Sequence, residues 1–155
     1  MGILNFLNKK PKDFFTDAEE QEIVGAIKSA EVKTSGEVRI YIESNCKYVS
    51  ALDRASEVFI SLDMFNTKER NATLIYVAIK DHQAAILGDA GIAEKVGADF
   101  WNKEIAMMLA HFKNNNIKDG IIAIINDIGD VLHTHFPYDN ENDVNELPDD
   151  IVFGK

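Results

Sequence analysis

One stretch near the middle of the chain, Arg70 to Gly91, constrains the fold more than any other part of the sequence. Its residues are RNATLIYVAIKDHQAAILGDAG. The run from Thr73 to Ile79 is almost unbroken β-branched and aromatic, which is typical of a strand buried on both faces. A polar break at Lys80 to His82 precedes a second apolar run, Gln83 to Leu87. The stretch therefore predicts a β-hairpin whose first strand lies inside a sheet.

The segments on both sides of the hairpin predict helices and one further strand. Strict alternation of side chains predicts a strand over Glu37 to Glu43. Thr16 and Glu19 have the spacing of a capping box, which begins the first helix. Helical periodicity predicts helices from Thr16 to about residue 31 and over residues 51–65, 99–113 and 117–135. This order predicts an α/β fold with a small mixed sheet.

Composition limits the kind of partner. Lys and Arg number 16 against 26 Asp and Glu, which gives a net charge of −10. This charge repels phosphate backbones and anionic lipid, so we expect no nucleic-acid partner, whereas it favours divalent cations. Cys46 is the only cysteine, which excludes a disulfide framework and a cysteine metal cluster. No stretch approaches the roughly 20 apolar residues of a transmembrane helix.

The chain divides into three predicted parts. Residues 1–13 form an N-terminal arm, residues 14–137 an α/β domain, and residues 138–155 an acidic C-terminal tail. The arm has a short apolar segment, Ile3 to Leu7, and the tail has apolar residues that we expect to dock, Leu147 and Ile151 to Phe153. Arm and tail are therefore the candidate segments for a protein partner.

The direction of each predicted strand follows from the element that connects it to the next strand, and these directions place several loops at one edge of the sheet. Two strands joined by a helix lie parallel, so the strands beginning near Glu37 and Thr73 start at the same edge of the sheet. The return strand of the hairpin ends at that edge, and Asp127 and Asp130 of the last helix are expected nearby. The predicted site edge consists of Ser35, Gly36, Glu37, Arg70, Asn71, Gly88, Asp89 and Gly91.

The side chains at this edge suit a hard cation. Calcium takes about 6–8 oxygen ligands in irregular geometry, which carboxylates from separate loops can supply. We therefore expect calcium ligands at Glu37, Asp89, Asp127 and Asp130. In the alternative, structural interpretation, Glu37 pairs with Arg70 and Asp89 caps the following turn. Open α/β sheets usually bind ligands at the opposite edge, where the candidates are Glu43, Ser44, Asn45, Asp53 and Asp81.

Several motifs, taken together, resemble the TPM domain, a family named after thylakoid-lumen, photosystem-repair and acetylcholine-receptor-modulator proteins. They are Thr34 to Val38, Thr67 to Val77 and Ile86 to Ile92, with Phe100-Trp101 and residues 120–137 fitting the same pattern. The resemblance covers about residues 14–137. It departs at Ala72, where many members have glycine.

The resemblance implies a three-layer α/β/α sandwich, with the small mixed sheet flanked by about four helices. It also implies calcium binding in some members, an acid phosphatase activity in a plant branch, and roles in the assembly or repair of membrane complexes. Many members carry a signal peptide and a membrane anchor. This chain shows neither pattern, so it resembles a stand-alone bacterial form that acts in the cytoplasm.

The sequence contains few of the motifs that are typical of an enzyme active site. The chain has no phosphate-binding glycine loop and no G-x-S-x-G nucleophile motif. Arg70, with Glu37 and Asp89, offers part of a metal-dependent phosphatase site. Our expectation is a non-catalytic, calcium-binding TPM-like domain that assists complex assembly or repair. The alternatives are a weak metal-dependent acid phosphatase and a protein-interaction module without metal.

Overall fold

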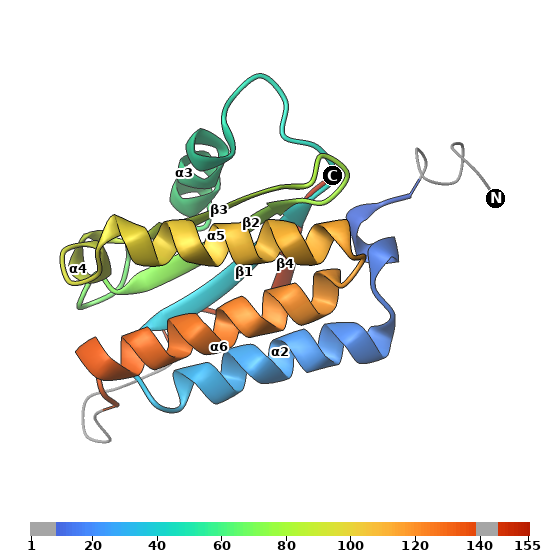
Figure 1. The fold of residues 1–155 in the computed structure, drawn as a ribbon. Coiled ribbons are helices and arrows are strands. Elements are labelled where there is room, and N and C mark those ends of the chain that lie inside the picture. The colour runs from blue at the N-terminus through green and yellow to red at the C-terminus, as the bar shows by residue number, and fades with distance from the viewer. Residues whose placement is uncertain (1–8, 139–145) are drawn as a thin grey trace.

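The computed structural model describes residues 9–138 and 146–155. A four-stranded sheet has the order β3-β2-β1-β4 (Figure 1). β1 lies parallel to both β2 and β4, and β3 runs antiparallel to β2, so the predicted mixed sheet is confirmed. The strands are β1 (Glu37–Glu43), β2 (Ala72–Ala78), β3 (Gln83–Gly88) and β4 (Ile151–Phe153).

Helices cover both faces of this sheet. Figure 1 shows α2, α5 and α6 side by side on one face, and α3 packs on the other. β2 connects the two layers, because Ile75 and Val77 pack with the first group of helices and Leu74 and Tyr76 pack with α3. The three-layer α/β/α architecture is therefore confirmed. The helical elements are η1 (Pro11–Phe14), α2 (Asp17–Glu31), α3 (Ala51–Ser61), α4 (Ala90–Ala93), α5 (Ala98–Lys113) and α6 (Ile117–His135).

The end of α3 differs from the prediction. The sequence predicted a helix to Phe65, but α3 ends at Ser61. Asp63 has a left-handed backbone with φ 54°. The Met64 amide donates to the Phe59 carbonyl oxygen at 3.1 Å, and the Asp63 amide donates to that of Ile60 at 3.0 Å. These bonds form a Schellman motif, which closes the helix although apolar periodicity continues beyond it.

The C-terminal residues contain a strand that the sequence did not predict. Ile151–Phe153 form β4, which is too short for a periodic pattern, and Leu147 is buried in the cluster beneath α3. Both segments therefore dock on the domain as expected. The apolar segment Ile3 to Leu7 lies outside the described residues, as do residues 139–145 of the predicted tail. Among the described helices, none has both the length and the apolar character required to cross a bilayer.

Candidate functional site

The predicted site edge exists as a continuous stretch of the structure. The start of β1 pairs with the start of β2, and Thr73 of β2 pairs with Gly88 at the end of β3. The amide of Asp89 donates to the carbonyl oxygen of Ala72 at 2.9 Å. The connection rules therefore placed these loops correctly, but the side chains along the edge separate into groups with different partners.

One group is a small polar network at the start of the strands. The Ser35 hydroxyl donates to the Glu69 carboxylate at 2.7 Å, and the Asn71 side-chain amide donates to both groups at 3.2 Å. Gly91 packs against this loop, since a Cβ atom there would lie 2.2 Å from the Glu69 carbonyl oxygen. Two other predicted site glycines also have packing roles, because a Cβ at Gly36 or Gly88 would lie 2.7 or 2.8 Å from an apolar side chain.

Arg70 and Asp89 form a second group. The guanidinium donates from Nε and Nη2 to the two carboxylate oxygens of Asp89, at 2.6 and 2.8 Å. Asp89 is buried and also accepts from the Ala90 amide at 2.7 Å, so it caps α4 as the structural interpretation predicted. Arg70 pairs with Asp89 rather than with Glu37. A cation at Asp89 would have to compete with this two-point ion pair.

A pocket of about 350 Å³ lies beside this pair, between α3 and β3. Its walls are mainly apolar, and it is lined by Ser56, Phe59, Ile60, Phe65, Arg70, Leu87, Gly88 and Asp89. Of the predicted cation ligands, only Asp89 lines it. A cation in the pocket would therefore find one carboxylate, that of Asp89, and this carboxylate is already paired with the guanidinium of Arg70.

The two predicted ligands on α6 lie elsewhere. Asp127 hydrogen-bonds with the side chain of Glu104 on α5, and Asp130 is exposed. Glu104 is only 6% exposed, and burial, followed by the hydrogen bond and charge of Asp127, raises its pKa to about 7. Its Oε2 atom has no hydrogen-bond partner among the described residues. The pair is a buried acidic contact between two helices.

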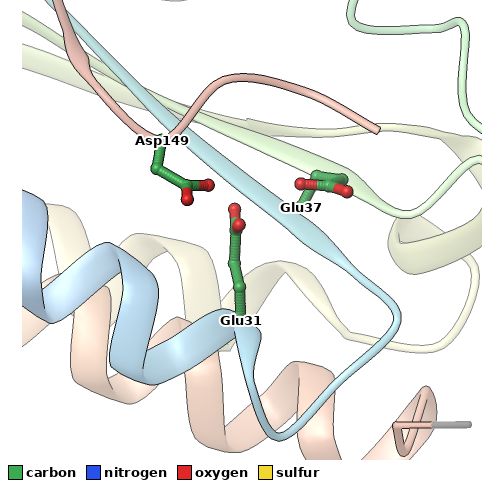
Figure 2. A group of neighbouring side chains, drawn as sticks. All are labelled: Glu31, Glu37 and Asp149. Atoms are coloured by element: carbon green, nitrogen blue, oxygen red, sulfur yellow. The ribbon is translucent and has the colours of Figure 1, made fainter. Parts of the chain in front are cut away.

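The acidic cluster of the described residues forms around the fourth predicted ligand, Glu37. Ligand atoms of Glu31, Glu37 and Asp149 all lie within 4.8 Å of one another. Figure 2 shows the three carboxyl groups converging from the end of α2, the start of β1 and the segment before β4. The short α2–β1 connection positions Glu31 near Glu37, and the pairing of β4 with β1 positions Asp149.

Hydrogen bonds orient two of these carboxyl groups. The Val38 amide donates to Glu31 Oε1 at 2.7 Å, and the Glu146 amide donates to Glu37 Oε1 at 2.7 Å. Glu37 is 2% exposed, and its Oε2 atom is buried with no hydrogen-bond partner among the described residues. A buried carboxylate oxygen without a partner is costly. The cluster is therefore arranged to accept something positively charged.

Protons are one such charge. Burial, a hydrogen bond with Asp149 and the charge of Glu37 raise the pKa of Glu31 well above its ordinary value. Burial raises the pKa of Glu37 to about 7, although the Glu146 amide and Glu31 oppose the rise. Carboxylates this close cannot all ionise without a compensating charge. Without a cation, these raised pKa values favour protonation of the cluster at neutral pH, and a divalent cation would displace the protons.

Sequence reasoning missed Glu31 and Asp149. Glu31 is the last residue of α2, where the sequence shows only the end of a helix. Asp149 is 118 residues further along the chain, in the acidic tail. The one usable signal was its place beside Asp150 immediately before the apolar triplet Ile151–Phe153, which was expected to dock.

The fold and this edge define the class of protein: a small α/β/α domain with a buried carboxylate cluster where β1 meets α2. The chain belongs to the TPM domain family, whose sequence profile matches residues 9–131. The predicted family is thus confirmed. No curated protein matches the chain.

Solved structures agree with this assignment. BA42 protein from the psychrophilic bacterium Bizionia argentinensis is 41% identical, with a TM-score of 0.83 over 91% of this chain and 96% of that one. An N-terminal domain from P. gingivalis is 16% identical, with a TM-score of 0.66 over 85% and 98%. The N-terminal domain of cg2496 from Corynebacterium glutamicum is 10% identical, with a TM-score of 0.60 over 76% and 74%. The last two show the shared fold alone.

Proposed function

We propose that this TPM domain binds a divalent cation, with calcium preferred, at Glu31, Glu37 and Asp149. The observation that carries the proposal is the convergence of three carboxyl groups within 4.8 Å, one of which, Glu37, has a buried oxygen with no hydrogen-bond partner among the described residues. Glu37 is retained from the predicted ligands. Glu31 and Asp149 take the place of Asp89, Asp127 and Asp130 because these three do not converge with Glu37.

Calcium fits the chemistry of this cluster better than magnesium. Three carboxylates offer up to six oxygen atoms, and the partly exposed Glu31 and Asp149 leave room for water ligands. Calcium accepts such irregular sets of oxygen ligands, whereas magnesium requires near-octahedral geometry and releases its water reluctantly. Zinc and copper would favour nitrogen or sulfur ligands, which this group lacks.

The proposed role is binding rather than phosphate hydrolysis. Carboxyl groups offer no positive charge to a phosphate ester, and Arg70, the cation that a phosphatase site at the predicted edge would need, is paired with Asp89. We further propose that the cation-bound domain acts in the assembly or repair of protein complexes, as its resemblance to TPM proteins implies.

Calorimetric titration of the chelator-treated, full-length chain tests the proposal, with magnesium as the competing ion. We expect saturable calcium binding and backbone amide shifts centred on Val38 and Glu146, which donate to the two oriented carboxylates. Glu37→Gln should weaken binding strongly, whereas Asp130→Asn, an exposed acid on α6, should leave it unchanged. Absence of saturable binding at millimolar calcium, or unchanged binding by Glu37→Gln, would reject the site.

A further inference from the structure

The C-terminal strap, defined here as residues 146–155, is attached along the outer edge of β1. β4 pairs with β1 in parallel from Ile40–Ile151 to Ile42–Phe153. Beyond it, the Gly154 amide donates to the Ile42 carbonyl oxygen at 2.8 Å, and the Ser44 amide donates to that of Lys155 at 2.9 Å. The strap thus covers a strand edge that would otherwise expose unpaired backbone groups.

The strand pairing that holds this strap is short. β4 has three residues, and it is an edge strand of the sheet. The ion pair between Asp150 and Arg39 is long, at 3.6 Å, and Asp150 is 72% exposed, so it contributes little. Leu147 supplies an apolar anchor in the cluster beneath α3. Ile151 is buried in the main core cluster, and Phe153 packs against that cluster. The strap thus has apolar contacts on both faces of the sheet, but its strand pairing covers only three residues at the sheet edge. A short edge strand is the kind of element that opens locally without global unfolding.

The acidic cluster is divided between the strap and the body of the domain. Glu31 and Glu37 belong to the body, whereas Asp149 belongs to the strap. When all three groups are ionised, docking therefore brings a third carboxylate against two others, which opposes attachment unless a proton or a cation lies between them. Glu37 Oε2, buried and without a partner among the described residues, marks the place that such a charge would occupy.

We infer that a divalent cation fastens the strap: bound between Asp149 on one side and Glu31 and Glu37 on the other, it holds β4 against β1. This inference rests on the proposed cation site and adds its regulatory consequence. Because coupling between two equilibria is reciprocal, the docked strap also strengthens cation binding. Loss of the cation then increases exposure of the β1 edge and of the apolar site that Leu147 fills.

Hydrogen exchange of the full-length chain, measured by NMR with calcium or with chelator, tests the inference. The Ser44 and Gly154 amides report on the strap, since both donate across the β1–strap boundary. The Ile79 amide donates to the Glu43 carbonyl oxygen at 2.9 Å and serves as the control within the sheet. We expect calcium to slow exchange of the two strap reporters by about tenfold or more and to leave Ile79 unchanged.

Two neighbouring strap residues provide a matched pair of variants. Asp149→Asn should weaken calcium binding and abolish the calcium effect on Ser44 and Gly154. Asp150→Asn removes an equal charge outside the cluster and should preserve both. Calcium binding in the calorimeter without slower exchange at the strap reporters would overturn the inference and leave the cation site standing. Absence of calcium binding would overturn the site itself, and the inference with it.

Discussion

The Glu37→Gln substitution is expected to stabilise the cation-free protein at pH 8 while weakening its calcium binding. Burial raises the pKa of Glu37 from 4.5 to about 7 in the folded state. Stability from this group is therefore fully present below pH 4.5 and is lost as the pH rises to about 7. Each pH unit between the folded and unfolded pKa values corresponds to about 1.4 kcal/mol, so the whole loss is about 3 kcal/mol.

Glutamine has the shape of the protonated acid and still accepts a hydrogen bond from the Glu146 amide, but it cannot ionise. Glu31 and Glu37 both contribute to the unfavourable charge of the cluster, so the substitution removes only part of the loss in stability. We expect Glu37→Gln to increase the free energy of unfolding by about 1–3 kcal/mol at pH 8 and by almost nothing at pH 4.5. A gain in stability paired with a loss of binding is typical of residues kept for function.

Urea unfolding with chelator at pH 4.5 and pH 8, for wild type and Glu37→Gln, measures this difference in the free energy of unfolding. Added calcium should then reverse the order, because a ligand at about 1,000 times its Kd stabilises the wild type by about 4.1 kcal/mol. The reasoning fails if Glu37→Gln is less stable than wild type at pH 8 in chelator, or if the difference between the two proteins is the same at both pH values.

Two further substitutions test the surroundings of the site by urea unfolding. Glu104→Gln should also stabilise the protein by about 1–3 kcal/mol at pH 8 but not at pH 4.5, since burial raises the pKa of Glu104 to about 7; its calcium titration should match that of wild type. Gly91→Ala should cost about 2–3 kcal/mol, because its Cβ would lie 2.2 Å from the Glu69 carbonyl oxygen. Gly25→Ala, in α2 with nothing within 4 Å of the new Cβ, should instead stabilise by about 0.5–1 kcal/mol.

Local sequence patterns predicted most elements of the fold. The apolar run from Thr73 differs from β2 by one residue at each end, and all seven residues of β2 are buried, as its composition indicated. The Thr16–Glu19 capping box also forms as predicted. These features depend on residues that are neighbours along the chain, so they can be predicted from the sequence alone. β4 was missed because three residues show no periodicity.

The candidate site was predicted only in part. Connection rules correctly brought the loops around Ser35, Asn71 and Gly88 to one edge, because handedness and strand direction follow from element order. Side-chain direction does not follow from that order. The structure directs Asp89 toward Arg70 and gives Glu37 other neighbours. Whether the predicted ligands on α6 and the division of the chain at residues 14 and 137 have functional meaning stays a prediction.

The sequence by itself determined the α/β class, the hairpin whose first strand lies inside the sheet, the TPM family and the placement of Glu37 at the start of a strand. Only the tertiary structure decided that Glu31 and Asp149 lie beside it. The physical reason is that a helix end and a C-terminal segment 118 residues apart meet through packing of the whole domain. Periodicity reports which face of an element is buried, whereas the distance between two carboxyl groups on different elements depends on how those elements pack.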